Sequence, residues 1–268
     1  MYKKMIVMDL DCTLLNNEKK VSDRTKECLL DLKKKGYLTV IATGRVLDSA
    51  IEVTDGACFA NYIISNDGGL IYGKDNDKII FKNVIDKKIV SNICSLYDSN
   101  TSYIDICDLH YYNKYTNNEY VNGGFSKKID DIDSFIKAVD VVNMGIKLKN
   151  SDDINKLVAD LNDCYSDIKS YVMYDSHNLN NKWIEISGIN ISKFNAIKMI
   201  AEIEGVDIQD IITFGDSTND IDMIKNSGVG VAMGNAIEDV KKVSKYITTS
   251  NNEDGVFEFL KQYLVGEI

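Results

Sequence analysis

The sequence has no proline, only two histidines and no long hydrophobic run. These absences limit which turns, catalytic groups and membrane segments the chain can contain. Without proline, turns must rely on glycine, asparagine and aspartate. The apolar run Met5-Ile6-Val7-Met8 meets a carboxylate after four residues, which is too short for a signal peptide or a membrane span. The six cysteines contain no C-x-x-C pair. We therefore expect free thiols in a reducing compartment and a cytoplasmic protein.

The charge balance and the missing motifs exclude several classes of function. A net charge of -10 repels nucleic-acid backbones and anionic lipid, so we expect neither as a partner. A metal and local cations can still draw a small anion into a pocket. There is no Walker loop and no G-x-S-x-G elbow, and Gly228, Gly230 and Gly234 lack dinucleotide spacing. His110 and His177 have no catalytic partner near them in the sequence.

What the sequence does contain is two short apolar strands that stop at carboxylates. Residues 5–8 lead into Asp9 and Asp11, and residues 211–214 lead into Asp216. Carboxylates at neighbouring strand ends repel one another unless a cation lies between them. If the two strands lie side by side in a parallel sheet, the three carboxylates surround one point. We therefore predict a hard-cation site there, with Mg²⁺ as the cation.

The order of elements predicts an α/β fold. A capped helix at 22–36 is followed by apolar strands at 37–42 and 62–64, and polar residues follow these strands at 43–45 and 67–69. An order of this kind implies a Rossmann-like parallel sheet with helices on both faces. Ligands of such sheets bind beyond the carboxyl ends of the strands. The polar groups after successive strands should therefore share one edge.

The α/β pattern stops after about Phe81 and returns at Ser192. Residues 83–188 alternate helical and extended stretches and are dense in Tyr, Asn and Asp. We predict that they form an inserted α+β cap domain, while residues 1–82 and 189–268 form a discontinuous core. We expect the insert to act as a lid that excludes water and reads the non-reacting part of a substrate.

The spacing of Asp9 and Asp11 suits a reaction as well as a metal. Residues two apart on an extended chain point the same way. Both carboxylates could then face one reacting atom, one as nucleophile and one as general acid/base. Taken alone, the motif is equally compatible with a loop that happens to be acidic.

Other positions could serve the same site. The Thr43 hydroxyl could donate to a phosphoryl oxygen beside Gly44, which lets the backbone come close, although an isolated Thr is more often an N-cap. Lys193 begins a helix, where its charge is unfavourable unless an anion is bound, and the alternative is a solvated surface lysine. Asp220, four residues after Asp216, suits either a role in orienting Lys193 or an N-cap.

Together, these residues resemble the motifs of the haloacid dehalogenase-like hydrolases. The segments that carry the resemblance are Asp9 to Leu15, Ala42 to Arg45, Lys193, Gly215 to Asp220, Gly228 to Ala236 and Thr249 to Val256. The likeness is to the Cof-type branch, subclass IIB, whose α/β cap is inserted between the second and third motifs. It covers both halves of the core and is loose in the cap, where only size and position match.

The resemblance implies a role for each position. Asp9 attacks the phosphoryl group to form an aspartyl-phosphate, and Asp11 protonates the leaving oxygen and then activates water. Mg²⁺ binds the carboxylates of Asp9 and Asp216 and the backbone carbonyl of Asp11, and Asp220 supports that shell. The implied substrate-binding residues, with Thr43 and Lys193 on the phosphoryl oxygens, are Thr43, Gly44, Arg45, Lys193 and Asn219.

Three residues depart from the family pattern. Cys12 stands where the family often has Gly or Asp, Phe194 follows Lys193 where Gly is common, and Asp67 replaces a more usual Asn-Gly. None of these changes removes a catalytic group. We expect Phe194 and Asp67 to alter the mouth of the pocket.

The implied function is a Mg²⁺-dependent phosphatase of small phosphorylated metabolites, such as sugar phosphates or phosphorylated cofactors. One alternative is a phosphomutase, which moves the phosphoryl group instead of releasing phosphate. Another is a phosphometabolite-binding protein, which binds without turnover. A dehalogenase is disfavoured because Asp11 would have no acid/base task in that reaction.

Overall fold

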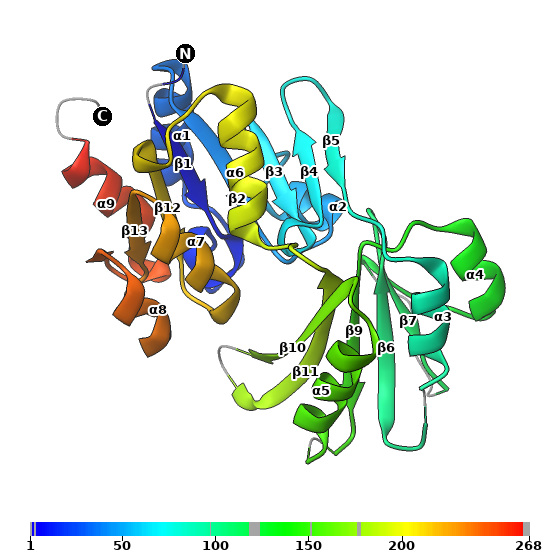
Figure 1. The fold of residues 1–268 in the computed structure, drawn as a ribbon. Coiled ribbons are helices and arrows are strands. Elements are labelled where there is room, and N and C mark those ends of the chain that lie inside the picture. The colour runs from blue at the N-terminus through cyan, green and yellow to red at the C-terminus, as the bar shows by residue number, and fades with distance from the viewer. Residues whose placement is uncertain are drawn as a thin grey trace. The chain divides into compact units, whose positions relative to one another are not determined.

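The chain divides into two units, each built on its own sheet (Figure 1). The first unit comprises Met1–Phe81 and Ser192–Ile268, and the second comprises Lys82–Ile191. The computed structural model describes residues 2, 4–96, 98–117, 124–150, 152–175 and 178–264.

The first unit is centred on an eight-stranded sheet with the order β14-β13-β12-β1-β2-β3-β4-β5. Its strands are β1 (Met5–Met8), β2 (Leu38–Ala42), β3 (Tyr62–Ser65), β4 (Leu70–Gly73), β5 (Lys78–Lys82), β12 (Ile211–Gly215), β13 (Val229–Ala232) and β14 (Tyr246–Ile247). The five pairings from β14 to β3 are all parallel. The next pairing, between β3 and β4, is antiparallel. The central strands are buried along their whole length, as expected for parallel strands covered on both faces.

Helices cover both faces of this sheet, as the sequence pattern predicts (Figure 1). They are α1 (Asp23–Lys34), α2 (Leu47–Val53), α6 (Lys193–Glu204), α7 (Ile221–Asn226), α8 (Glu238–Val243) and α9 (Gly255–Tyr263). Helix α1 packs against α9, while α7 packs against both α6 and α8. The predicted cap of α1 is present, since the Ser22 side chain accepts from the backbone N–H of Thr25.

The second unit is α+β. Its sheet has the order β10-β11-β9-β6-β7-β8. The strands are β6 (Thr101–Cys107), β7 (Tyr112–Tyr115), β8 (Ser126–Lys128), β9 (Asn143–Leu148), β10 (Ile168–Asp175) and β11 (Asn178–Gly188), and the helices are α3 (Lys87–Cys94), α4 (Ile132–Ala138) and α5 (Ile154–Cys164).

The two faces of this second sheet differ. Ile104, Ile146 and Ile184 are register partners across three strands and lie in the apolar core that the sheet shares with its helices. The positions beside them, which are Asp105, Gly145 and Glu185, face the opposite side because side chains alternate along a strand. We call this opposite face the open face of the insert's sheet.

The predicted fold class is confirmed: a Rossmann-like parallel-sheet core is interrupted by an α+β insert. No helix in the described part of the chain is long and apolar enough to cross a membrane.

Candidate active site

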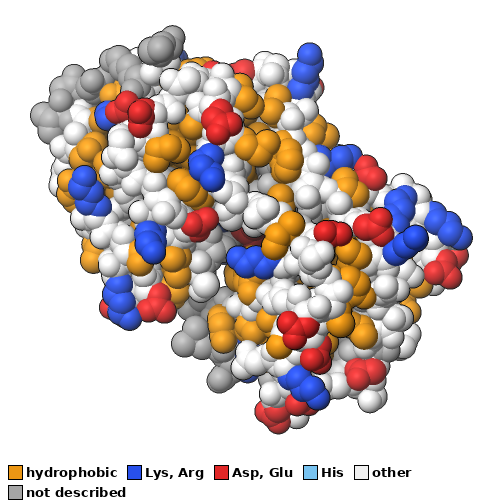
Figure 2. Space-filling view, in the orientation of Figure 1, with side chains coloured by type: hydrophobic (Ala, Val, Ile, Leu, Met, Phe, Trp, Pro, Cys, Tyr) orange, Lys and Arg blue, Asp and Glu red, His pale blue; other side chains and the backbone are white. Residues whose placement is uncertain are grey.

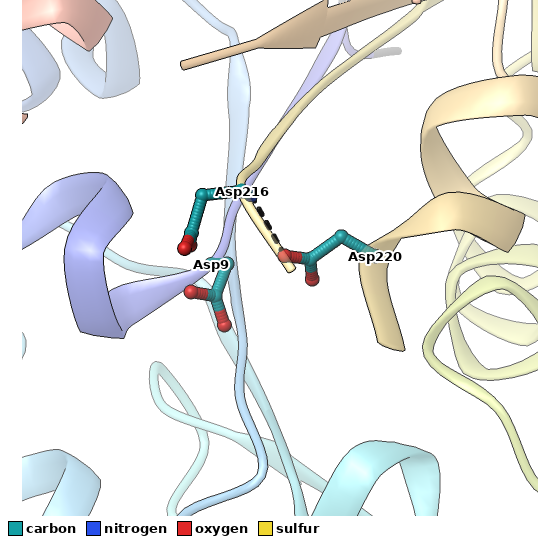
Figure 3. Close-up of side chains that lie close together, drawn as sticks. All are labelled: Asp9, Asp216 and Asp220. Carbon is teal, nitrogen blue, oxygen red and sulfur yellow. Dashed lines mark hydrogen bonds between the residues drawn. The ribbon is translucent and has the colours of Figure 1, made fainter. Parts of the chain in front are cut away.

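The pairing of β1 with β12 brings together the two acidic stretches from opposite ends of the chain. Met8 pairs with Phe214, and the N–H of Asp9 continues the ladder by donating to the carbonyl oxygen of Phe214 at 3.0 Å. Asp9 and Asp216 therefore leave the same edge of the sheet side by side, as predicted (Figure 3). On its other side β1 pairs with β2, whose end is followed by the buried Thr43.

An irregular turn, Leu10–Leu14, follows Asp9 and is closed by backbone hydrogen bonds from Leu14 to Asp9 and from Leu15 to Leu10. Cys12 has a φ of +59°, in the left-handed region, and its carbonyl oxygen accepts from Nδ2 of Asn235 at 2.7 Å. Oγ1 of Thr13 donates to Oδ1 of Asp216 at 2.9 Å. These contacts tie the turn to the C-terminal half of the core and fix the direction of the Asp9 side chain.

Lys193 is a buried residue of the site, which overturns the alternative of a solvated surface lysine. Its Nζ atom lies 2.7 Å from Oδ1 of Asp9 and 2.7 Å from Oδ1 of Asp220. The side chain has no exposed surface. Burial alone would lower the pKa of this lysine, but the charges of Asp220 and Asp9 outweigh it and raise that pKa.

Both carboxylate oxygens of Asp220 accept hydrogen bonds from other residues of the site. Its Oδ2 accepts the backbone N–H of Asp216 at 2.9 Å (Figure 3). The same oxygen accepts the N–H of Ser217 at 3.0 Å, while Oδ1 accepts from Lys193. Gly215 makes this possible, because a Cβ there would lie 2.5 Å from Cβ of Asp220. Asp220 lies close enough to Asp9 and Asp216 to complete a three-carboxylate group. Its engaged oxygens favour the predicted orienting role.

All the charged residues that are buried in the described part of the chain belong to this one site. They are Asp9, Asp67, Asp216, Asp220 and Lys193. Four carboxylates against one ammonium group leave an excess of buried negative charge, and buried charges are costly unless they are paired or coordinate metals.

The acid–base state of two of these carboxylates reflects that excess. Burial raises the pKa of Asp9 well above its ordinary value, although Lys193 opposes the rise. Burial and the neighbouring charge of Asp220 raise the pKa of Asp216 to about 7. A divalent cation between Asp9 and Asp216 would relieve both effects. The oxygen ligands present therefore fit a hard cation such as Mg²⁺.

The Asp11 side chain turns away from that cluster and pairs with two cations. Nε and Nη2 of Arg45 donate to its two oxygens at 2.6 and 2.8 Å, and Nζ of Lys19 donates at 2.8 Å. Burial by itself would raise the pKa of Asp11, but these partners outweigh it and hold the pKa at about 2. The Asp11 carboxylate is therefore not part of the three-carboxylate group, and its oxygens are held by Arg45 and Lys19.

The loop after β2 also carries predicted residues. Thr43 accepts from the N–H of Arg45 through Oγ1 at 3.2 Å and is almost fully buried. Gly44 lies against Asp67, since a Cβ at Gly44 would lie 3.1 Å from Oδ2 of that carboxylate. The guanidinium of Arg45 engages Asp11 and Ser49. The expectation that Arg45 contacts substrate therefore remains a prediction.

Asp67 is the site residue whose position the sequence analysis missed. We expected it at the pocket mouth, but it is buried, accepts from Nδ2 of Asn219 at 2.8 Å and lies 3.9 Å from Nζ of Lys193. Gly68 brings it there, because its Cα packs so closely on the carbonyl of Ser192 that a Cβ would lie 2.3 Å from that oxygen. The sequence feature that could have indicated this position is that Asp67 shortly follows the end of β3.

Both histidines belong to the insert. His110 is exposed, and its backbone N–H donates to Oδ1 of Asp108 at 2.7 Å. His177 lies outside the described residues.

The chain is similar to proteins with known names. One is the 5-amino-6-(5-phospho-D-ribitylamino)uracil phosphatase YcsE of Bacillus subtilis, at 29% identity over 98% of this chain and 96% of the relative. Another is YitU, a phosphatase of the same description from the same organism, at 28% identity over 97% of each chain.

Solved structures agree in fold. A haloacid dehalogenase-like hydrolase from Bacteroides thetaiotaomicron matches 98% of this chain and 100% of its own with a TM-score of 0.81 and 27% identity. A subclass IIB sugar phosphatase matches 99% of this chain with a TM-score of 0.80 at 21% identity, which shows the shared fold.

The family model described as haloacid dehalogenase-like hydrolase matches residues 6–260, nearly the whole chain. The resemblance drawn from the motifs is thereby confirmed, and the protein belongs to the haloacid dehalogenase-like hydrolases.

Proposed function

We propose that the protein is a Mg²⁺-dependent phosphatase of small phosphorylated metabolites that works through an aspartyl-phosphate on Asp9. The observation that carries the proposal is the convergence of the chain's buried charges on one point, with Lys193 bridging Asp9 and Asp220 at 2.7 Å each. Perturbed, buried ionisable groups at the carboxyl edge of a parallel sheet are typical of a catalytic site.

Asp9 is suited to be the nucleophile. One of its oxygens, Oδ1, is held by Lys193, so the carboxylate has a fixed orientation. Attack of the other oxygen on phosphorus forms the new O–P bond and expels the alkoxide or phenoxide of the substrate. Lys193 stays at the same point and can stabilise negative charge on the transferring phosphoryl group.

Asp11 is suited to move the protons. With a pKa of about 2 in its pairing with Arg45 and Lys19, Asp11 is ionised but only weakly basic, so these pairings must loosen before it can accept a proton from the water that hydrolyses the aspartyl-phosphate. To protonate the leaving oxygen first, its carboxyl must weaken those pairings, since they favour the charged form.

The metal would be held by Asp9, Asp216 and the backbone carbonyl of Asp11, which agrees with the raised pKa values of the two carboxylates. When bound, Mg²⁺ neutralises negative charge in the pocket and helps to orient the phosphoryl group. Thr13 and Asp220 contribute from the protein side, because they fix the side chain and the backbone of Asp216.

The names of the relatives indicate the general class of substrate. Two of them are named for a phosphorylated ribitylaminouracil and a structural neighbour for sugar phosphates. We propose small phosphorylated organic molecules of these kinds as substrates, with the phosphoryl group bound by Thr43, Gly44, Arg45, Lys193 and Asn219. Selection among them is assigned to the insert.

The experiment that tests this function is a phosphate-release screen of sugar phosphates and phosphorylated cofactors with added Mg²⁺. Asp9→Asn serves as the matched inactive protein. We expect release by the wild-type protein and none by the variant. Transfer of the phosphoryl group to another position without free phosphate would indicate a phosphomutase. Saturable binding without turnover would indicate a binding protein.

A further inference from the structure

The groups that we assign to the phosphoryl oxygens already hold a carboxylate of the chain itself. Oδ1 of Asp67 accepts from Nδ2 of Asn219 at 2.8 Å and lies 3.9 Å from Nζ of Lys193. Its Oδ2 lies against Gly44, at 3.1 Å from where a Cβ would stand. An ammonium group, an amide N–H and a bare glycine backbone are the kinds of partner that a phosphoryl oxygen also uses.

The position of Asp67 is strongly determined by its surroundings. Asn66 and Asp67 have φ values of +51° and +52°, in the left-handed region that Asn and Asp adopt more readily than other non-glycine residues. The backbone is held there by two hydrogen bonds, from the N–H of Asn66 to the carbonyl of Arg45 and from the N–H of Asp67 to that of Thr43. These bonds hold the turn that carries Asp67 against the loop after β2.

We propose that Asp67 is an internal competitor of the phosphoryl group: its carboxylate contacts the same groups that we assign to the phosphoryl oxygens and weakens the binding of phosphate. The inference rests on the proposed function and deepens it, because it concerns the affinity of the same site for substrate and product.

The charge balance of the pocket supports a repulsive role. Asp67 is the fourth buried carboxylate around one buried lysine. Lys193 has two closer carboxylate partners in Asp9 and Asp220, so Asp67 is not needed to neutralise it. A phosphate ion that enters must face the charge of Asp67 at short range in a poorly solvated site, where like charges repel strongly. The expected benefit is fast release of product phosphate.

The test compares inorganic phosphate binding, with Mg²⁺ present at pH 8.5, in wild-type protein and in Asp67→Asn. The amide keeps the shape of the side chain and can still accept from Asn219, but it has no charge. Titration calorimetry and product inhibition of aryl-phosphate hydrolysis should both give tighter phosphate binding in the variant, by about tenfold or more. The KM for the aryl phosphate should fall with it.

Two further variants keep the result interpretable. Asp55→Asn is the matched control, because Asp55 also has a left-handed φ of +55° but has an exposed side chain that pairs with Lys26. It should bind phosphate as the wild type does. Asp67→Gly removes the charge at a backbone conformation that glycine accepts readily, so it replaces Asp67→Asn if that variant does not fold.

The outcomes separate this inference from the proposed function. If the wild type hydrolyses aryl phosphates but Asp67→Asn binds phosphate equally or more weakly, Asp67 is a positioning residue and the competitor role is overturned. An equal gain in phosphate affinity in Asp55→Asn also overturns the competitor role, because the loss of any negative charge would then be enough to tighten phosphate binding. If the wild type hydrolyses nothing, the phosphatase function fails, while the calorimetric comparison still decides the role of Asp67.

Discussion

Nζ of Lys193 lies 2.7 Å from Oδ1 of Asp9, although 184 residues separate them in the chain. The contact joins the first strand of the core to the first helix that follows the insert. It also distinguishes the two oxygens of the proposed nucleophile, because one is held by a cation and the other is not.

Asp9→Asn is expected to abolish turnover, because an amide is a far poorer nucleophile than a carboxylate. Asp11→Asn should keep Mg²⁺ binding, since only its backbone carbonyl is proposed to contact the metal, and should lose roughly 10²–10⁴-fold in rate. Steady-state hydrolysis of an aryl phosphate and calorimetric Mg²⁺ titration measure the two properties. Near-normal turnover in Asp9→Asn would remove Asp9 from the role of nucleophile.

Removal of the metal is expected to stop hydrolysis reversibly. Activity should disappear in excess chelator and return with Mg²⁺, because Asp9 and Asp216 need a cation between them. Ca²⁺ should restore activity poorly, since its looser geometry can engage both oxygens of Asp9 and leave none to attack. Full activity in excess chelator would contradict the metal site.

The metal-free protein is expected to lose stability as the pH rises. The pKa of Asp216 is about 7 in the folded protein, against about 3.9 for an unfolded aspartate. The folded state therefore binds more protons than the unfolded state between these values, and unfolding becomes easier as pH increases through that window.

Thermal unfolding of chelated protein between pH 5 and pH 8 measures the effect, and Asp216→Asn should flatten the curve. Mg²⁺ should restore more stability at pH 8 than at pH 5, because it binds the ionised carboxylates. A wild-type curve with the same slope as that of Asp216→Asn would exclude Asp216 as the source.

Substitutions in the insert are expected to change substrate preference, whereas substitutions at the core site should lower activity on all substrates. On the open face of the insert's sheet, Nε1 of Trp183 donates to Oε2 of Glu185 at 2.9 Å. Trp183→Leu should alter the ranking of natural phosphates and affect a small aryl phosphate much less. Ile184→Val, in the apolar core on the opposite face, should leave the ranking unchanged.

Lys193→Ala in the core should instead lower activity on every substrate together, because it acts on the shared phosphoryl group. One substrate panel run on all three variants provides the comparison. Equal losses on all substrates for Trp183→Leu would show that the insert does not select them.

Most of the fold could be predicted because its signals are local. The Ser22 cap, the apolar strands and the carboxylates at their ends depend on neighbouring residues, and parallel pairing then brings Asp9 beside Asp216. The burial of Asp67 could not be predicted in this way. It depends on the packing of Gly68 against Ser192, a contact between segments more than 120 residues apart that no local pattern encodes.

The partners of Arg45 were hidden for the same reason. A Thr-Gly-Arg segment after a strand suggests contact with an anion, and the structure supplies one from the chain itself, Asp11. Only the parallel pairing of β1 with β2 reveals that the two loops face each other. The local sequence indicated which residues lie at the site. The side-chain contacts among these residues depend on how the strands pair in the sheet.

The fastening of the Asp9 turn by Asn235 has a consequence for protein synthesis. Asp9 is translated before the insert, yet the strand beside it and the asparagine that secures its turn follow it in the chain by more than 200 residues. The insert, by contrast, is one continuous segment. A nascent chain can thus complete the insert before Asp9 has its neighbours, so the proposed site can assemble only after β12 and Asn235 have been made.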